Sequence, residues 1–232
     1  MKNLDLALNG ACSININTSA DEEKELAILF LDIRNFTGLM ESQPGQVVIN
    51  VVRRLFTAFN TIVKNFQGKV VEIAGDNLYA VFGLQTGVRE AANNAYQATK
   101  AIFQTVSMFN EAYAEPFYGG PLEIGVGLHT GKVFVGEFGL DGASNLSVMG
   151  LPVNIAARLQ SKTKELNNDL LISEEAYSLL DSDGVSFNTQ TINLQGISHG
   201  QQVRLAGKSY NNGHYLNSAS SQNFDYLLAI SG

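Results

Sequence analysis

Two spacings of hydrophobic residues alternate along this chain. Apolar runs of only a few residues are too short for most helices, so they predict buried strands. Between these runs, apolar residues recur every three or four positions, which predicts helices with one face on the core. In order, the pattern predicts a strand over 24–31, a helix over 46–66, strands over 70–73 and 78–82, a helix over 88–114, strands over 122–129 and 133–138, a helix over 153–161, a strand over 170–172, a short helix over 173–180, and strands over 186–194 and 202–205.

Residues that favour turns and helix ends separate the predicted elements. Gly75-Asp76-Asn77 and Thr130-Gly131-Lys132 each have the composition of a tight turn, so each predicts a hairpin. Gln67-Gly68 is typical of a helix end, Pro152 is tolerated in a first helical turn, and Ser173 is a favourable helix cap. Strands and helices in this order predict an α+β fold, in which helices cover a mixed, mostly antiparallel sheet.

Composition divides the chain into three parts. Residues 1–23 are polar and rich in turn-forming residues, which predicts a flexible N-terminal arm. Residues 24–207 hold the predicted elements, and a chain of 232 residues is long enough for one elaborated domain with a sizeable core. Residues 208–232 are predicted to be a polar C-terminal tail, within which the apolar stretch 224–228 could dock on the domain.

Charge and residue usage exclude several classes of protein. A formal net charge of −7 and a pI near 4.9 argue against a general nucleic-acid-binding surface. The single cysteine, Cys12, excludes an internal disulfide and a cysteine-based zinc site, and His129, His199 and His214 are too far apart to indicate a histidine metal site. No apolar run approaches the ~20 residues of a bilayer span, and the N-terminal residues make a poor signal peptide. We therefore expect a cytoplasmic protein with no membrane or nucleic-acid partner.

Two aspartates lie next to apolar segments of the chain. Asp32 ends the first predicted strand and Asp76 occupies a predicted hairpin tip. Carboxylates that converge at strand ends are a common way to hold Mg²⁺ against substrate phosphates. Alternatively, Asp32 caps the turn at 34–37 and Asp76 is an ordinary turn residue. The spacing alone leaves both interpretations open.

Four segments of the chain occur together in an order and spacing found in one enzyme family. They are Phe30–Thr37, Gly75–Gly83, Gly125–Val133 and Gly150–Ser161. In these segments, and over roughly residues 24 to 205, the chain resembles the class III nucleotidyl cyclases. The resemblance implies their ferredoxin-like α+β fold and the conversion of a nucleoside triphosphate to a 3′,5′-cyclic nucleotide.

The resemblance assigns roles to residues of the first two segments. Asp32 and Asp76 match the family's two metal-binding aspartates, and the carbonyl of Ile33 would add a backbone ligand. Two Mg²⁺ or Mn²⁺ ions per site would clamp the triphosphate and lower the pKa of the ribose 3′-hydroxyl, whose alkoxide attacks the α-phosphorus and expels pyrophosphate. Phe36 and Thr37 match positions that contact the phosphates.

Asn154 and Arg158 lie four residues apart on a predicted helix, so their side chains leave the same face. Without further context, the pair could be a solvated arginine beside a polar neighbour. The resemblance assigns both to transition-state stabilisation, for which a planar guanidinium suits a phosphate. In the family, this pair and the metal aspartates come from opposite subunits, which implies a homodimer with its sites at the interface.

Glu72 and Ser147 match the family positions that select the base. Glu72, which could instead be a solvent-facing strand residue, stands where adenylate cyclases typically have lysine, and this disfavours ATP. A carboxylate suits guanine, and it does not exclude uracil or cytosine. Compact cyclases of bacterial antiphage defence, which make cyclic pyrimidine nucleotides, resemble this architecture. We therefore favour UTP or CTP slightly, with GTP next, and a guanylate cyclase of ordinary bacterial signalling as an alternative.

Gln195 stands where the family usually has a lysine that binds the terminal phosphates. A neutral amide removes one charge contact, for which Arg204 or Lys208 could compensate. The same departure favours a rival hypothesis, in which the chain is an inactive cyclase homologue that dimerises and regulates a partner.

Overall fold

The computed structural model describes residues 22–115, 120–138, 145–181 and 187–210. Most of the predicted arm, including Cys12, and the stretch at 224–228 lie outside the described residues. The elements are β1 (Glu22–Ile33), α2 (Phe36–Ser42), α3 (Gly45–Asn65), β2 (Gly68–Ala74), β3 (Asn77–Phe82), α4 (Val88–Phe109), the π-helical turn η1 (Asn110–Ala114), β4 (Ile124–Phe138), β5 (Asn145–Met149), α6 (Leu151–Glu165), β6 (Leu170–Ser173), α7 (Glu174–Tyr177), β7 (Asn188–Ile192) and β8 (Gln201–Leu205).

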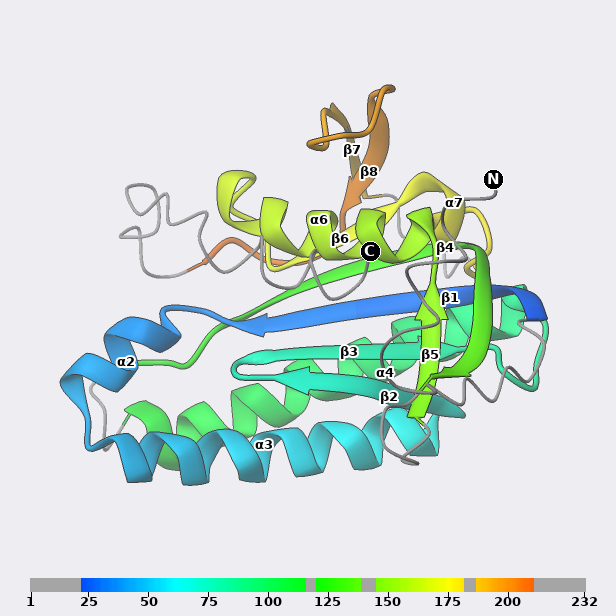
Figure 1. Cartoon of the computed structure of the whole chain (residues 1–232). Coiled ribbons are helices and arrows are strands. Elements are labelled where there is room, and N and C mark those ends of the chain that lie inside the picture. The colour runs from blue at the N-terminus through cyan, green and yellow to red at the C-terminus, as the bar shows by residue number, and fades with distance from the viewer. Residues whose placement is uncertain (1–21, 116–119, 139–144, 182–186, 211–232) are drawn as a thin grey trace, which may run out of the picture.

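An eight-stranded sheet forms the centre of the domain. Seven strands follow the order β2-β3-β1-β4-β6-β8-β7, and β5 pairs with β4. The β4–β6 pair is parallel and the other pairs are antiparallel. Helices α3 and α4 lie along one face of the sheet and α6 lies along the other (Figure 1). The predicted α+β class and the mostly antiparallel sheet are therefore confirmed.

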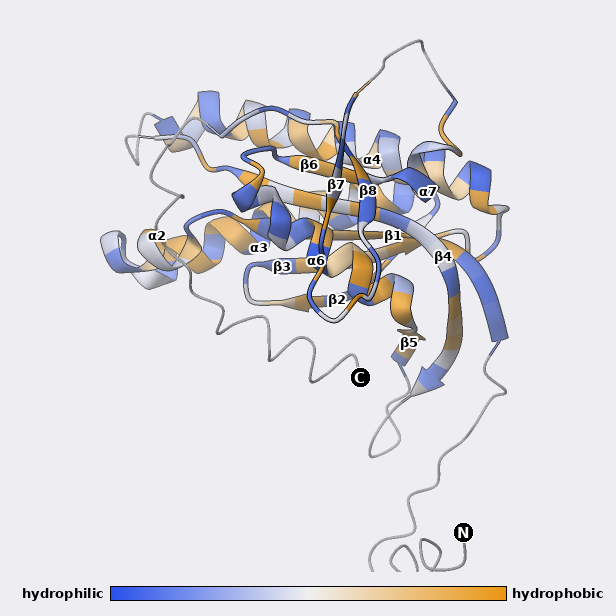
Figure 2. Cartoon of the chain, turned by 90° about the horizontal axis from the view of Figure 1, so that it is seen from above, coloured by the Kyte–Doolittle hydropathy of each residue, from blue (hydrophilic) through white to orange (hydrophobic). Residues whose placement is uncertain are grey.

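The alternation of side chains along β1 divides the core into two layers. Ala27, Leu29 and Leu31 belong to the larger hydrophobic cluster, which α3 and α4 complete. Ile28 and Phe30 belong to a second cluster on the face that α6 covers. Because side chains alternate with a period of two, Asp32 is placed on the α6 face. Figure 2 shows that the start of β1, before these apolar residues, is hydrophilic.

The predicted hairpin at Thr130-Gly131-Lys132 is wrong. Residues 124–138 form one continuous strand, β4, which pairs with nearly the whole length of β1. Gly131 serves close packing instead of a turn, because a Cβ there would lie 2.6 Å from Cγ of Pro152. The strand that pairs with the end of β4 is β5, which the hydrophobic pattern did not predict.

The helices agree with the pattern except at their ends. The predicted stripe on α3 is buried, with residues such as Val48, Leu55 and Phe59 in the core. The helix predicted over 88–114 changes to a π-helical turn after Phe109, and Met108 near this change is 69% exposed. Helix α2 was not predicted. In the described part of the chain, no helix combines the length and apolar character that a transmembrane span requires.

Two further predictions at the end of the domain are confirmed. The hydroxyl of Ser173 caps α7 by accepting a hydrogen bond from the backbone N–H of Ala176, 3.2 Å away. Strands β7 and β8 pair antiparallel and place β7 at the edge of the sheet.

Candidate active site

Asp32 and Asp76 lie at the same end of neighbouring strands. Asp32 is the next-to-last residue of β1, opposite Asn77 of β3, and Asp76 lies in the turn that joins β2 to β3. The backbone N–H of Ile33 donates to the carbonyl of Asp76 at 3.2 Å, which ties the turn to the end of β1. The structure therefore brings together the two aspartates that the sequence assigned to metal binding.

Burial makes both carboxylates unfavourable as anions. The pKa of Asp32 is raised to about 6, chiefly by burial and also by the charge of Asp76, although Arg34 and Lys164 oppose the rise. Burial also raises the pKa of Asp76, while its own backbone N–H, Lys164 and Arg34 lower it. Two neighbouring carboxylates that are shielded from water are stabilised as anions when a cation binds between them.

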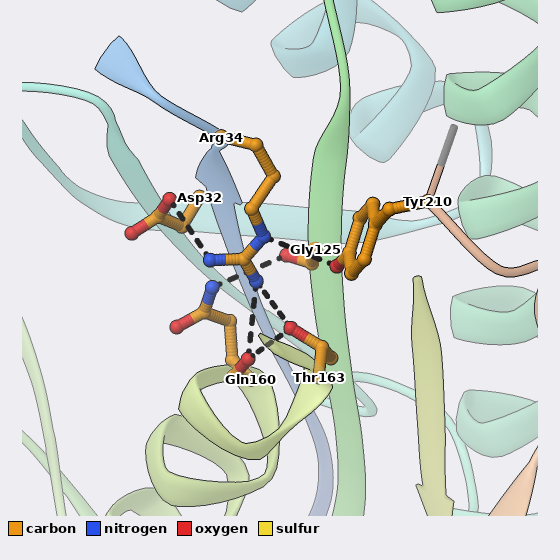
Figure 3. Close-up of polar contacts among 6 residues, drawn as sticks. All are labelled: Asp32, Arg34, Gly125, Gln160, Thr163 and Tyr210. Atoms are coloured by element: carbon orange, nitrogen blue, oxygen red, sulfur yellow. Dashed lines mark hydrogen bonds and ion pairs between the residues drawn. The ribbon is translucent and has the colours of Figure 1, made fainter. Parts of the chain in front are cut away.

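Arg34 is a buried cation beside the two aspartates, with only 1% of its side chain exposed. Its guanidinium donates to Oδ1 of Asp32 at 3.4 Å and, through Nε, to the hydroxyl of Tyr210 at 3.1 Å. The third nitrogen donates to the carbonyl of Gln160 at 3.2 Å and to Oγ1 of Thr163. Figure 3 shows how these contacts join the end of β1 to the last turns of α6 and to Tyr210.

The segment that carries Tyr210 is fastened to the loop before β6. The N–H of Tyr210 donates to Oδ1 of Asn167 at 3.2 Å, and Asp169 exchanges two hydrogen bonds with the backbone of Lys208 at 2.9 and 2.7 Å. Sequence reasoning missed Arg34 and Tyr210 as parts of the site. The arginine two residues after Asp32 was a usable signal, but no local pattern links it to a tyrosine in a polar stretch.

Glycines on β4 allow α6 to lie directly on the sheet. A Cβ at Gly127 would collide with the backbone of Ala156 and Gln160, and one at Gly125 would collide with the Arg34 guanidinium. Since these positions alternate with Val126, the glycines share one face of β4. The close approach fixes α6, and with it the predicted pair Asn154 and Arg158, over the centre of the sheet.

Arg158 extends toward the loop between β7 and β8. Its guanidinium lies 3.4 Å from the position that a Cβ of Gly196 would take, and Gly196 has a positive φ of 70° within a turn. The neighbouring Gln195 is exposed. The buried Nε of Arg158 has no hydrogen-bond partner among the described residues. The structure thus brings Arg158 and Gln195 to one region, where a phosphate could satisfy the guanidinium.

The chain does not bring Arg158 to its own aspartates. Asp32 lies on β1, whereas Arg158 extends toward the loop that precedes β8, three strand positions away in the sheet. At the usual spacing between strands, β1 and β8 lie about 14 Å apart. The metal half and the transition-state half of the predicted site are therefore separate within one chain.

Glu72 and Ser147 lie on strands that come close in space. Glu72 pairs with Tyr79 in the β2–β3 ladder, and Ser147 pairs with Gly136 in the β4–β5 ladder. Strands β2 and β5 are in contact, although they are not neighbours in the sheet. Both side chains are half-buried. Their neighbourhood agrees with the prediction that they act together, which stays a prediction.

Phe36 and Thr37 lie in the first turn of α2, close in sequence to Asp32. Their backbone follows Asn35, which adopts a left-handed conformation with φ of 54°. Within residues 22–115, 120–138, 145–181 and 187–210, no group of three or more His, Cys, Asp and Glu side chains could hold a metal. Asp32 and Asp76 are a pair and do not by themselves make such a group.

The sequence is similar to a known protein family and to curated proteins. The family model described as "Adenylate and Guanylate cyclase catalytic domain" matches residues 18–217. An uncharacterised protein of Mycobacterium bovis is 31% identical over 193 residues, which are 80% of this chain and 31% of that protein. The chain therefore spans about a third of the length of that curated relative.

Two solved structures share the fold. The adenylyl cyclase CyaB from P. aeruginosa has a TM-score of 0.74 and 26% sequence identity, covering 83% of this chain and 98% of its own. The guanylyl cyclase Cya2 has a TM-score of 0.71 and 24% identity, covering 83% and 97%. The predicted class III architecture is confirmed by these likenesses.

Proposed function

From the premise that the chain belongs to the adenylate and guanylate cyclase catalytic domain family, we propose that it converts a nucleoside triphosphate to a 3′,5′-cyclic nucleotide and pyrophosphate. The observation that carries this proposal is the pair Asp32 and Asp76 at adjoining strand ends. Burial raises the pKa of both carboxyls, and the charge of Asp76 adds to the rise at Asp32, as suits a site that binds a cation.

The donor set of this pair fits Mg²⁺ or Mn²⁺, two ions per site. Asp32, Asp76 and the carbonyl of Ile33 offer hard oxygen ligands in small number, and Mg²⁺ prefers a few carboxylates completed by water and phosphate. When bound, such ions would neutralise the triphosphate and acidify the ribose 3′-hydroxyl. Arg34 would hold the Asp32 carboxylate in place through its contact at 3.4 Å.

Residues of the protein would stabilise the transition state, orient the ribose and bind the terminal phosphates. The buried Nε of Arg158 has no partner within the described ranges, so the guanidinium is available to neutralise charge that develops on the α-phosphate. Asn154, on the same face of α6, would orient the ribose. The backbone around Phe36 and Thr37 would hold the terminal phosphates beside the aspartates.

A symmetric homodimer would join the two halves of the site. The direction of Arg158, toward the loop before β8 and not toward the end of β1 that carries Asp32, supports this arrangement. Exposed apolar side chains offer a surface for the second copy. They are Ile73 (50%), Phe134 (50%), Met149 (41%) and Leu151 (57%), of which Phe134 and Met149 lie opposite each other in the β4–β5 ladder.

For the base, we propose UTP or CTP slightly ahead of GTP, with ATP disfavoured. Glu72 supports this order, because a carboxylate can accept a hydrogen bond from a base N–H but opposes the N1 lone pair of adenine. The lean toward pyrimidines, and with it a role in antiphage signalling, rests on analogy with compact defence cyclases. The alternative is a guanylate cyclase of ordinary bacterial signalling, because the Glu72 carboxylate suits guanine as well.

A second candidate is a regulatory dimer without activity, which the exposed Gln195 favours. A cyclase with a neutral residue there loses one charge contact to the triphosphate. Under the active hypothesis, Gln195→Lys should lower the KM for the nucleotide several-fold and leave kcat within about twofold. An inactive regulatory dimer would gain nothing from that change.

One experiment tests the proposal directly. The purified protein is incubated with Mn²⁺ and each of the four nucleoside triphosphates, and the cyclic product is identified by mass spectrometry. Asp32→Ala should abolish turnover, while its circular dichroism spectrum matches wild type. Activity near wild type in Asp32→Ala would remove the metal assignment, and no product from any nucleotide would favour the regulatory dimer.

A further inference from the structure

Tyr79 carries a buried hydroxyl without a hydrogen-bond partner in the part of the chain that the structure describes. The residue is 7% exposed, and its ring stacks on Phe30 with centroids 4.5 Å apart and planes 6° from parallel. The stack fixes the ring and with it the position of the hydroxyl. A buried hydroxyl that is left unpaired is destabilising, and proteins seldom keep one without a use.

Glu72 lies directly across the ladder from this tyrosine. The β2–β3 register shifts between Val70 and Glu72, so that Val71 is left as the extra residue of a bulge and Glu72 pairs with Tyr79. Directly opposed residues share one face of a sheet and lie about 5 Å apart. The carboxylate helps to raise the pKa of the tyrosine, after burial, as expected for close neighbours. A hydrogen-bond donor and an acceptor therefore stand side by side without bonding to each other.

The surroundings of this pair are apolar and include β5. Tyr79 packs with Phe30 and with Val148 of β5 in the hydrophobic cluster on the α6 face. Strand β5, which carries the predicted base-selecting Ser147, therefore borders the Tyr79–Phe30 stack, with the Ser147 side chain on the opposite face of the strand from Val148. An apolar wall with a few polar groups is the usual lining of a site for a flat, hydrogen-bonding ring.

We propose that Tyr79 and Glu72 together recognise a nucleobase with adjacent N–H and carbonyl groups, as in uracil and guanine. The Tyr79 hydroxyl donates to the base carbonyl, and the Glu72 carboxylate accepts from the ring N–H. Adenine and cytosine present a ring lone pair to the carboxylate, so the second contact is lost. This inference rests on the proposed function and deepens it, because it separates UTP from CTP and adds Tyr79 as a specificity-determining residue.

The test uses Tyr79→Phe, which removes one oxygen and keeps the stacked ring. The values of kcat/KM are measured for UTP, GTP, CTP and ATP in wild type, in Tyr79→Phe and in Tyr113→Phe, a control that removes the same atom from an exposed tyrosine elsewhere. Loss of one neutral hydrogen bond should lower kcat/KM for UTP and GTP about three- to tenfold. CTP and ATP should change less than about twofold, as should all four nucleotides in the control.

Stability and binding supply two readouts that do not depend on turnover. Since the hydroxyl has no partner among the residues that the structure describes, Tyr79→Phe should melt at or above the wild-type temperature, and the stabilisation that saturating UTP or GTP gives should shrink. A clear fall in melting temperature without nucleotide would show that the hydroxyl is already bonded, and would overturn the inference. Equal effects on all four nucleotides, or none on any, would also overturn it.

The proposed function can fail separately from this inference. If wild type forms no cyclic product but is stabilised by UTP or GTP, and Tyr79→Phe loses that stabilisation, recognition of the base stands and catalysis does not. If no nucleotide stabilises or reacts with wild type, both the proposed function and the role of Tyr79 are wrong.

Discussion

The guanidinium of Arg34 donates through Nε to the hydroxyl of Tyr210 at 3.1 Å, across 176 residues of sequence. The same group contacts Asp32, so the position of a candidate metal ligand depends on the packing of a residue near the end of the described chain. The arginine is almost fully buried, and its partners lie on three separate segments.

Removing this buried cation should be strongly destabilising. Arg34→Met leaves Asp32 without its counter-ion and leaves the Gln160 carbonyl without that donor, so we expect a loss of about 3–5 kcal/mol in the free energy of unfolding. Tyr210→Phe removes one hydrogen bond to a charged group and should cost about 1–3 kcal/mol. Urea denaturation measures both, with the exposed Arg53→Met as control. Equal stability of Arg34→Met and Arg53→Met would show that the network contributes nothing.

His129 should make the fold sensitive to acid. Its side chain is 5% exposed, its Nδ1 lies 2.7 Å from Oγ of Ser173, and burial lowers its pKa to about 4 despite the nearby Glu175. The unfolded chain has a histidine pKa near 6.5, so the folded state binds fewer protons below that value. Stability is therefore full above pH 6.5 and is lost as the pH falls toward 4, by about 3 kcal/mol.

His129→Gln should remove that part of the pH dependence. The free energy of unfolding is measured in urea between pH 7.5 and pH 4 for wild type and for the variant. The matched control is His199→Gln, because His199 is exposed. If both variants keep the wild-type slope between pH 6.5 and 4, the acid sensitivity lies in other groups.

The contact between β4 and α6 should not tolerate a methyl group. In Gly131→Ala, the new Cβ would lie 2.6 Å from the ring of Pro152, so α6 must shift, at a cost of about 1–3 kcal/mol. Gly120→Ala is the control, because a Cβ there meets nothing within 4 Å. Thermal melting compares the two variants. A melting temperature for Gly131→Ala equal to that of the control would mean that the helix has room to move.

If the two halves of the site come from different subunits, two inactive variants should complement each other. Asp76→Ala damages the metal half and Arg158→Ala the transition-state half, so a heterodimer holds one intact site and one doubly damaged site. Random exchange of subunits would restore about a quarter of the wild-type activity. The assay mixes the variants after partial denaturation and follows pyrophosphate release. No recovery, with exchange demonstrated by differently tagged chains, would contradict a shared site.

The base preference should move toward ATP in a double variant. Glu72→Lys replaces an acceptor with a donor that suits the N1 lone pair of adenine, and Ser147→Asp adds an acceptor for its amine. The ratio of kcat/KM for ATP to that for the best wild-type substrate should rise at least about tenfold. Each single variant serves as a control for the other. If the wild-type protein has its highest kcat/KM on ATP, a residue other than Glu72 determines the base preference.

Much of the fold could be predicted because its elements follow local rules. The stripe on α3 and the turn at Asp76 depend on residues close in sequence, and both are present in the structure. The turn predicted at Gly131 was wrong because glycine also permits close packing, and only the position of Pro152 on a distant helix distinguishes the two uses. Strand β5 and helix α2 are short segments whose stability comes mainly from the neighbours they pack on.

The candidate site was predictable in part for the same reason. Asp32 and Asp76 stand in recognisable segments, and the structure brings them together. The parts that sequence reasoning missed are contacts between distant segments. Tyr210 reaches Arg34 only because the backbone at Lys208 runs along the loop at Asp169, and the role of Tyr79 depends on a bulge that changes the register of β2.

The pairing of β1 with β4 has a consequence for the order in which the protein can fold during synthesis. The paired residues of these strands lie about a hundred positions apart in the chain. At ribosomal rates of roughly 5–20 residues per second, β1 waits on the order of 5–20 seconds after it emerges before β4 is available. Until then one edge of a strand that contains six consecutive buried residues, Leu26–Leu31, stays open to other chains. The strand at the centre of the finished sheet is therefore synthesised early and paired late, so yields of soluble protein should respond strongly to translation speed and to chaperones.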